Sequence, residues 1–120
     1  MEFYNWNKEN IVSFLANAIT NNVLLTTVTC PNKFYNTDAS ADSVCYEEKL
    51  ADVLLAGHYI YITYDEDDVH MLTLDKMIKQ FPVFVKECPR DYLDLSMDNA
   101  DLITYDSLMQ IILFGEIVYR

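Results

Sequence analysis

The clearest pattern in the chain is the spacing of apolar residues over 8–20. They recur three and four positions apart, which places them on one stripe of an amphipathic helix: Ile11, Phe14, Leu15, Ala18 and Ile19. Asn7 can cap the first turn of this helix, and the pair Asn21 and Asn22 is expected to end it. We therefore predict an N-terminal helix over these residues.

Two further helices follow from similar spacing and from the residues at their ends. The second opens at Asp42 or Ser43, and Gly57 is placed to close it because glycine readily adopts the left-handed backbone that ends helices. Thr73 can cap the third helix. Pro82 lies inside that helix and lacks an N–H to bond the preceding turn, so we expect a kink or a break there.

β-Branched and aromatic residues predict strands in three segments. The first is 23–29, and the other two are 58–64 and 69–73, which a hairpin loop over 65–68 would join. The polar segment 30–41 is expected to be a long loop. The sheet is therefore predicted to be small and mainly antiparallel.

Two patterns describe the C-terminal part of the chain. Apolar and polar residues alternate around Leu93, Leu95 and Met97, and a short strand or an extended loop fits this equally well. A last helix is expected to open at Thr104 or Asp106 and to end at Gly115, with 116–119 as a tail or edge strand. Its predicted core residues are Leu108, Ile111 and Ile112.

Length and composition indicate one folded domain, residues 1–120. Hydrophobic residues make up 52% of the chain and aromatic residues 13%, which is too rich for a disordered acidic tail. The N-terminal residues show no basic and apolar leader, and no apolar run approaches the length of a membrane span, so we expect a cytoplasmic protein. About four helices and a small antiparallel sheet give an α+β fold.

Charge changes this picture most. Nineteen Asp and Glu oppose eight Lys and Arg, which leaves a net charge of −11. The field of such a domain repels nucleic acids and attracts proteins with basic grooves. We therefore expect no direct nucleic-acid binding and a protein partner with a basic groove.

The carboxylates are clustered, and two tyrosines accompany them. No Lys or Arg occurs over 91–119, a segment that holds a possible acidic ridge: Asp91, Asp94, Asp98, Asp101 and Asp106. A second acidic cluster is Asp65, Glu66, Asp67 and Asp68. Tyr59 and Tyr61 share one face of the predicted strand and suit a protein interface. These residues are the candidate partner-binding set, although a merely solvated acidic surface would give the same pattern.

Two segments resemble known sequences. The run from His70 to Ile78 (HMLTLDKMI) is similar to an "HLTLDKLL" segment, and the run from Gln110 to Tyr119 (QIILFGEIVY) is similar to a "QYALFGEIVY" ending. Both occur in an uncharacterised family of small acidic proteins that phages and mobile elements of Gram-positive bacteria encode. The resemblance covers roughly the last fifty residues. It implies a genomic context and no chemistry, and Phe81, Pro82 and Val83 depart from the family's pattern.

Metal and catalytic sites have weaker support in the sequence. The acidic loop lacks the Gly and the spaced ligands of a calcium loop, and the Cys and His residues lack zinc-site spacing. The carboxylates could hold magnesium in a small hydrolase of nucleotides or nucleic acids, with Lys76 and His70 nearby, but no spacing requires it. We therefore assign no catalytic residue, metal ligand or cofactor.

The leading hypothesis is an inhibitor that binds a host defence enzyme acting on nucleic acids. Its carboxylates would occupy the enzyme's groove as a DNA mimic does, in the manner of anti-restriction or anti-CRISPR proteins. One alternative is the metal-dependent hydrolase. Another is an immunity protein or antitoxin that neutralises a basic toxin through the same electrostatics.

Overall fold

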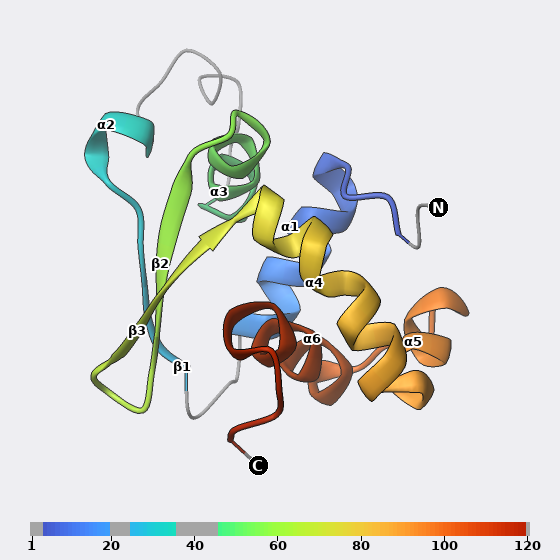
Figure 1. Cartoon of the computed structure of the whole chain (residues 1–120). Coiled ribbons are helices and arrows are strands. Elements are labelled where there is room, and N and C mark those ends of the chain that lie inside the picture. The colour runs from blue at the N-terminus through green and yellow to red at the C-terminus, as the bar shows by residue number, and fades with distance from the viewer. Residues whose placement is uncertain (1–3, 20–24, 36–45, 120) are drawn as a thin grey trace.

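The computed structural model describes residues 4–19, 25–35 and 46–119. These ranges form a three-stranded antiparallel sheet and six helices (Figure 1), which confirms the α+β fold class although the sequence predicted about four helices. The elements are α1 (Lys8–Ile19), β1 (Leu25–Thr29), α2 (Asn32–Tyr35), α3 (Tyr46–Leu55), β2 (Tyr59–Tyr64), β3 (Asp68–Thr73), α4 (Leu74–Glu87), α5 (Pro89–Ser96) and α6 (Leu102–Phe114).

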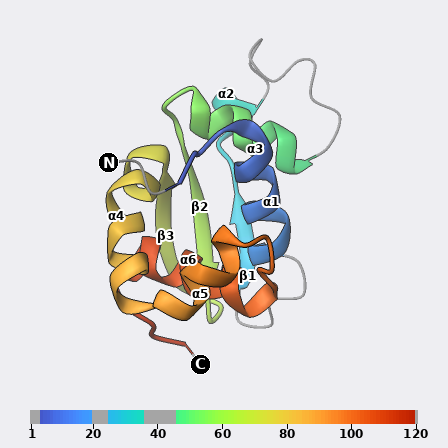
Figure 2. The same cartoon turned by 90° about the vertical axis from the view of Figure 1, so that its right-hand side faces the viewer.

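The sheet has the order β1-β2-β3, with both pairs antiparallel. Side chains alternate across its two faces, so Ile60, Ile62 and Leu72 are fully buried on the face that meets the helices. Figures 1 and 2 together show the longer helices on this one side of the sheet, with α5 farthest from it. The fold is therefore a sheet covered on one face.

Helix α6 occupies the centre of the helical layer, where it contacts α1, α4, α5 and β3. Its sequence is apolar almost all round, and buried side chains extend from Leu108 through Leu113. A helix with this composition has to be enclosed by neighbours, because exposing each branched side chain would cost roughly 1.5–3 kcal/mol. Among the described residues, no helix has both the length and the apolar character needed to cross a membrane.

Several helix ends follow the sequence prediction. Asn7 Oδ1 accepts a hydrogen bond from the Asn10 N–H at 2.8 Å, and Thr73 Oγ1 accepts one from the Lys76 N–H at 3.1 Å. Gly57 (φ +86°) closes α3 with a reversed turn in which the His58 N–H donates to the Val53 carbonyl. The expected ends at Asp42, Ser43, Asn21 and Asn22 lie outside the described residues.

The irregular structure differs in part from the prediction. The expected loop over 30–41 contains the one-turn helix α2, and α4 continues through Pro82 to Glu87 without the break that was one of the two expected outcomes. Pro82 itself is exposed, while Phe81 and Phe84 on either side are buried. The apolar face of α4 packs against α6 and α5, and this packing outweighs the roughly 3 kcal/mol that proline costs inside a helix.

The C-terminal elements also differ from the prediction. Residues 93–97 are neither strand nor loop, because α5 covers most of them after opening with Pro89 in its first turn. Helix α6 begins at Leu102, earlier than predicted, since Asp101 and not Thr104 or Asp106 caps it. Residues 116–119 form a tail without strand pairing.

Truncating Ile111 tests whether α6 lies in the core. Ile111→Ala should lower the free energy of unfolding by about 2–5 kcal/mol, because the side chain is fully buried and its removal leaves a cavity. Ile103→Ala on the same helix is the matched control, since Ile103 is exposed and its loss should change stability by less than about 0.5 kcal/mol. Urea denaturation measures both. Equal midpoints for the two variants would contradict the assignment of α6 to the core.

Candidate functional site

The α5–α6 corner, defined here as residues 93–103, brings together most of the predicted ridge. Helix α5 ends in a reversed turn in which the Asn99 N–H donates to the Asp94 carbonyl at 2.8 Å, and the Asp98 N–H donates to the Leu95 carbonyl at 3.3 Å. Asp98 takes the left-handed conformation (φ +58°) where the equivalent turns of α3 and α6 have Gly57 and Gly115. An acidic residue therefore occupies a position that suits glycine better.

Two acids of the predicted ridge, Asp101 in the corner and Asp91 beside it, have distinct environments. Asp101 caps α6 by accepting hydrogen bonds from the Thr104 N–H (2.9 Å) and hydroxyl (3.0 Å), and the bond from the backbone N–H chiefly holds its pKa below the ordinary value. Burial raises the pKa of Asp91, whose carboxylate also accepts a hydrogen bond from Ser107. Repulsion from Asp94 and Asp101 raises the pKa of Asp91 further, which indicates that these like charges lie close together.

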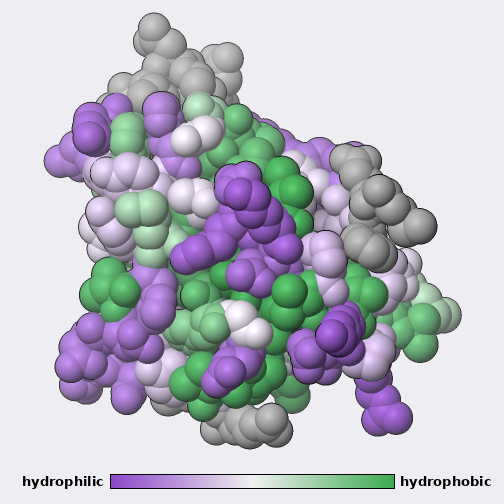
Figure 3. All heavy atoms as spheres, viewed as in Figure 1, coloured by the Kyte–Doolittle hydropathy of each residue, from purple (hydrophilic) through white to green (hydrophobic). Residues whose placement is uncertain are grey.

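Exposed apolar side chains lie among these carboxylates. The exposed fractions are 54% for Leu93, 61% for Met97, 43% for Leu102 and 72% for Ile103. In Figure 3, hydrophobic atoms reach the surface at the position that α5 occupies in Figure 1. Large apolar side chains interspersed with acids are typical of a protein-binding surface, because the apolar side chains are poorly solvated by water.

Asp106 does not belong to the corner. Its Oδ1 accepts a hydrogen bond from the Tyr64 hydroxyl at 3.0 Å, and its Oδ2 accepts one from Gln110 Nε2 at 2.8 Å. Gln110 is buried and also binds the tail, since its Oε1 accepts hydrogen bonds from the Val118 and Tyr119 N–H groups. The structure therefore places Asp106 in a network that fixes the C-terminal tail.

The second acidic cluster lies far from the corner. Asp65, Glu66 and Asp67 form the exposed tip of the β2–β3 hairpin, with Asp65 and Glu66 at positive φ. Figure 1 places this tip and α5 at opposite ends of the molecule. The two acidic clusters are thus separate surfaces.

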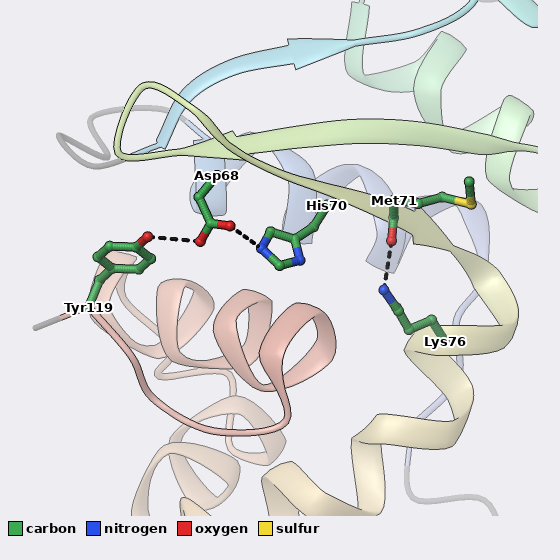
Figure 4. Close-up of polar contacts among 5 residues, drawn as sticks. All are labelled: Asp68, His70, Met71, Lys76 and Tyr119. Atoms are coloured by element: carbon green, nitrogen blue, oxygen red, sulfur yellow. Dashed lines mark hydrogen bonds and ion pairs between the residues drawn. The ribbon is translucent and has the colours of Figure 1, made fainter.

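Asp68 differs from its three acidic neighbours because its carboxylate is engaged on both sides (Figure 4). Asp68 Oδ2 accepts a hydrogen bond from the Tyr119 hydroxyl and Oδ1 contacts His70 Nε2, each at 2.8 Å. The bond from Tyr119, with a smaller contribution from His70, lowers the pKa of Asp68. The same bond raises the pKa of Tyr119 to about 12. The Tyr119 ring also stacks on Tyr64, so this cluster secures the tail against the sheet.

Tyr59 and Tyr61 lie on the face of the sheet that the helices leave uncovered. Their rings make an edge-to-face contact with centroids 5.4 Å apart. Both side chains are half-buried and lie apart from the α5–α6 corner, which is on the other side of the helical layer. The predicted partner-binding residues therefore do not form one surface, and most of them lie at the corner, at the hairpin tip or on the open sheet face. The others make hydrogen bonds within the molecule: Asp91, Asp68 and Asp106.

The described residues contain no group of three or more His, Cys, Asp or Glu side chains that is arranged to hold a metal ion. Comparison of the chain with protein-family models, with curated proteins and with solved structures finds no match.

Sequence reasoning missed the apolar half of the corner. The alternation of Leu93, Leu95 and Met97 fits a period of two, which conceals their helical arrangement. On a helix, Leu93 and Met97 are four residues apart and share a face, whereas Leu95 points the other way into the core. Pro89, a residue favoured in the first turn of helices, was the available signal.

Asp98→Gly tests the strained turn of the corner. The substitution should raise the free energy of unfolding by about 0.5–1 kcal/mol, because glycine adopts positive φ without the steric cost that Asp98 bears. Asp98→Ala is the control: it removes the same charge but keeps the Cβ, so it should give no gain. Urea denaturation measures both, and equal stabilisation by the two would show that charge and not backbone strain decides.

Asp68→Asn tests the tail contact through pH. The pKa of Asp68 is lowered in the folded state, so its stabilisation is fully present above its ordinary value of 3.8 and is lost as pH falls through the folded value. The wild-type protein should melt at a higher temperature than Asp68→Asn near neutral pH, and the difference should shrink in acid. In a Tyr119→Phe background the same difference should be smaller, since the main donor to Asp68 is gone. A difference independent of pH would contradict this account.

Proposed function

We propose that the chain is a non-enzymatic inhibitor that binds a protein through the α5–α6 corner and occupies a basic, nucleic-acid-binding groove on it. The observation that carries this proposal is the combination of exposed apolar side chains with carboxylates at one corner. No Lys or Arg occurs over 91–119 to neutralise that corner. The net charge of −11 extends the same sign over the whole domain.

The two kinds of side chain have different roles in this binding. Asp94, Asp98 and Asp101 would take the places of phosphates and pair with the Arg and Lys of the groove, which steers the encounter and selects a basic partner. The apolar residues Met97 and Ile103 would supply contact area that desolvates on binding and slows dissociation. A groove that binds nucleic acid can accommodate both the carboxylates and the apolar side chains, because it combines cations with apolar surfaces that stack on bases.

The resemblance of the last fifty residues to proteins of phages and mobile elements favours a bacterial defence enzyme as the target, for example a restriction nuclease or a CRISPR effector.

The triple variant Asp94→Asn, Asp98→Asn and Asp101→Asn tests the proposal. Asparagine preserves side-chain size, tolerates the left-handed conformation and caps helices as well as aspartate does, so the variant should fold. We expect the wild-type chain to raise phage plating on bacteria that carry such a defence enzyme, and the triple variant to lose most of this effect. Where the purified enzyme is inhibited, inhibition should weaken steeply between about 50 and 200 mM salt.

The hairpin tip offers a matched control. Asp65→Asn, Glu66→Gln and Asp67→Asn also remove three charges, but at the other end of the molecule. This variant should keep most of the inhibition. Equal losses from both triple variants would show that net charge and not the corner matters. Loss of activity from one single substitution without loss of binding would favour the hydrolase hypothesis instead.

A further inference from the structure

The sheet has an open face whose side chains are all uncharged. The pairing registers place the following residues on this side of the sheet, all of them at least partly exposed except Thr63, which is buried: Thr27, Thr29, Tyr59, Tyr61, Thr63, Val69, Met71 and Thr73. Val69 and Met71 are 57% and 41% exposed. In a chain of which 22% is charged, a surface rich in Tyr, Met and Thr without a single charge matches the composition of an interface core.

Both edges of the sheet have carbonyl groups that side chains already occupy. The Tyr46 hydroxyl donates to the Val28 carbonyl of β1 at 3.2 Å. Lys76 Nζ donates to the Met71 carbonyl of β3 at 2.9 Å (Figure 4). Such contacts hinder the addition of a further strand at either edge. The open face is therefore better suited to association than the edges are.

The two ends of the open face carry opposite charges. Asp65, Glu66 and Asp67 lie at the hairpin end, where β2 turns into β3. Lys33 lies at the other end, where its Nζ is 4.9 Å from the centroid of Phe34 and Phe34 makes an edge-to-face contact with Tyr59. Burial chiefly raises the pKa of Tyr61, and the Lys33 ammonium lowers it in part.

We propose that the open sheet face binds a second copy of this chain in a symmetric, face-to-face dimer. The two-fold axis lies in the interface and runs across the strands, so the acidic hairpin tip of each copy meets Lys33 of the other. An axis along the strands would instead bring two acidic tips together. The proposal goes beyond the proposed function and leaves the α5–α6 corner of each copy exposed.

The occupant is a second copy because the face is complementary to itself. Its centre is the uncharged row formed by Thr29, Tyr61 and Met71, which are paired across the three strands. Two chains of net charge −11 repel each other, so contact through any acidic surface is unfavourable. The open face has an uncharged centre, with a cation at one end and carboxylates at the other. Repulsion between the two copies is therefore weakest when they meet through this face.

Sedimentation velocity over micromolar to near-millimolar concentration tests the dimer. The wild-type chain should show a concentration-dependent dimer. Met71→Asp, which puts a charge in the central row, should raise the dissociation constant at least about tenfold. Ile103→Asp adds the same charge at the exposed α5–α6 corner and should dimerise like the wild type. Val69→Asp is a second variant of the face in case Met71→Asp fails to fold, which circular dichroism will show.

A charge exchange tests the orientation of the two copies. Lys33→Glu and the tip variant Asp65→Lys, Glu66→Lys and Asp67→Lys should each weaken the dimer, because each places like charges opposite one another. The tip variant is decisive, since it reduces the net negative charge and would strengthen association if general repulsion governed it. The double variant, which combines the tip variant with Lys33→Glu, restores opposite charges in both contacts and should recover dimerisation.

Three results would overturn the proposal. A wild-type chain that stays monomeric at all concentrations excludes the dimer. Equal effects of Met71→Asp and Ile103→Asp exclude the sheet face as its interface. A double variant no better than Lys33→Glu alone excludes the antiparallel arrangement. Each result leaves the proposed function intact, because inhibition through the corner is measured separately.

Discussion

The burial of α6 is the constraint on which the rest of the structure depends. Its apolar sequence requires neighbours on most sides, and α1, α4, α5 and β3 supply them. A carboxylate on this helix is therefore expected at one of its ends, or else within the helix with hydrogen-bond partners. Asp101 lies at the N-terminal end, where the helix dipole and the free N–H groups stabilise an acid. Asp106 lies within the helix and has Tyr64 and Gln110 as partners.

This constraint explains why a run of acids in the sequence does not become one acidic ridge. Asp91 is partly buried against Ser107, Asp106 is bound internally, and only the acids at the α5–α6 corner remain near one another at the surface. A count of acids in the sequence includes every carboxylate, whereas only the carboxylates that packing leaves exposed can contact a partner. The corner therefore carries fewer acids than the sequence suggests, but it also carries exposed apolar side chains, which would make the proposed binding more specific.

Local signals predicted the regular elements well and the site less well. Apolar spacing located α1, α4 and α6, and the Asn7 cap, the Thr73 cap and the Gly57 and Gly115 ends follow from properties of single residues. The two errors have different causes. At Pro82, tertiary packing outweighs the local cost of a proline inside a helix, whereas at α5 the alternation of apolar residues conceals a helix that Pro89 favours locally. Sequence spacing cannot show the hydrogen bond between Asp68 and Tyr119, because these residues are far apart in the chain. It also cannot show the bonds of Gln110 to the tail, because they depend on the burial of Gln110.

The distribution of charge over the surface is itself an argument about function. Two acidic groups occupy opposite ends of the molecule, while the open sheet face carries no charge at any outward position. Folding alone does not require this separation, because mixing Lys among the acids would reduce repulsion at no cost to the core. Separation is useful when different surfaces meet different partners. An acidic corner attracts a basic groove and repels a second copy of the same chain, whereas an uncharged face permits a contact that repulsion would otherwise prevent. One small domain can then associate with itself and still leave the acids of its α5–α6 corner exposed.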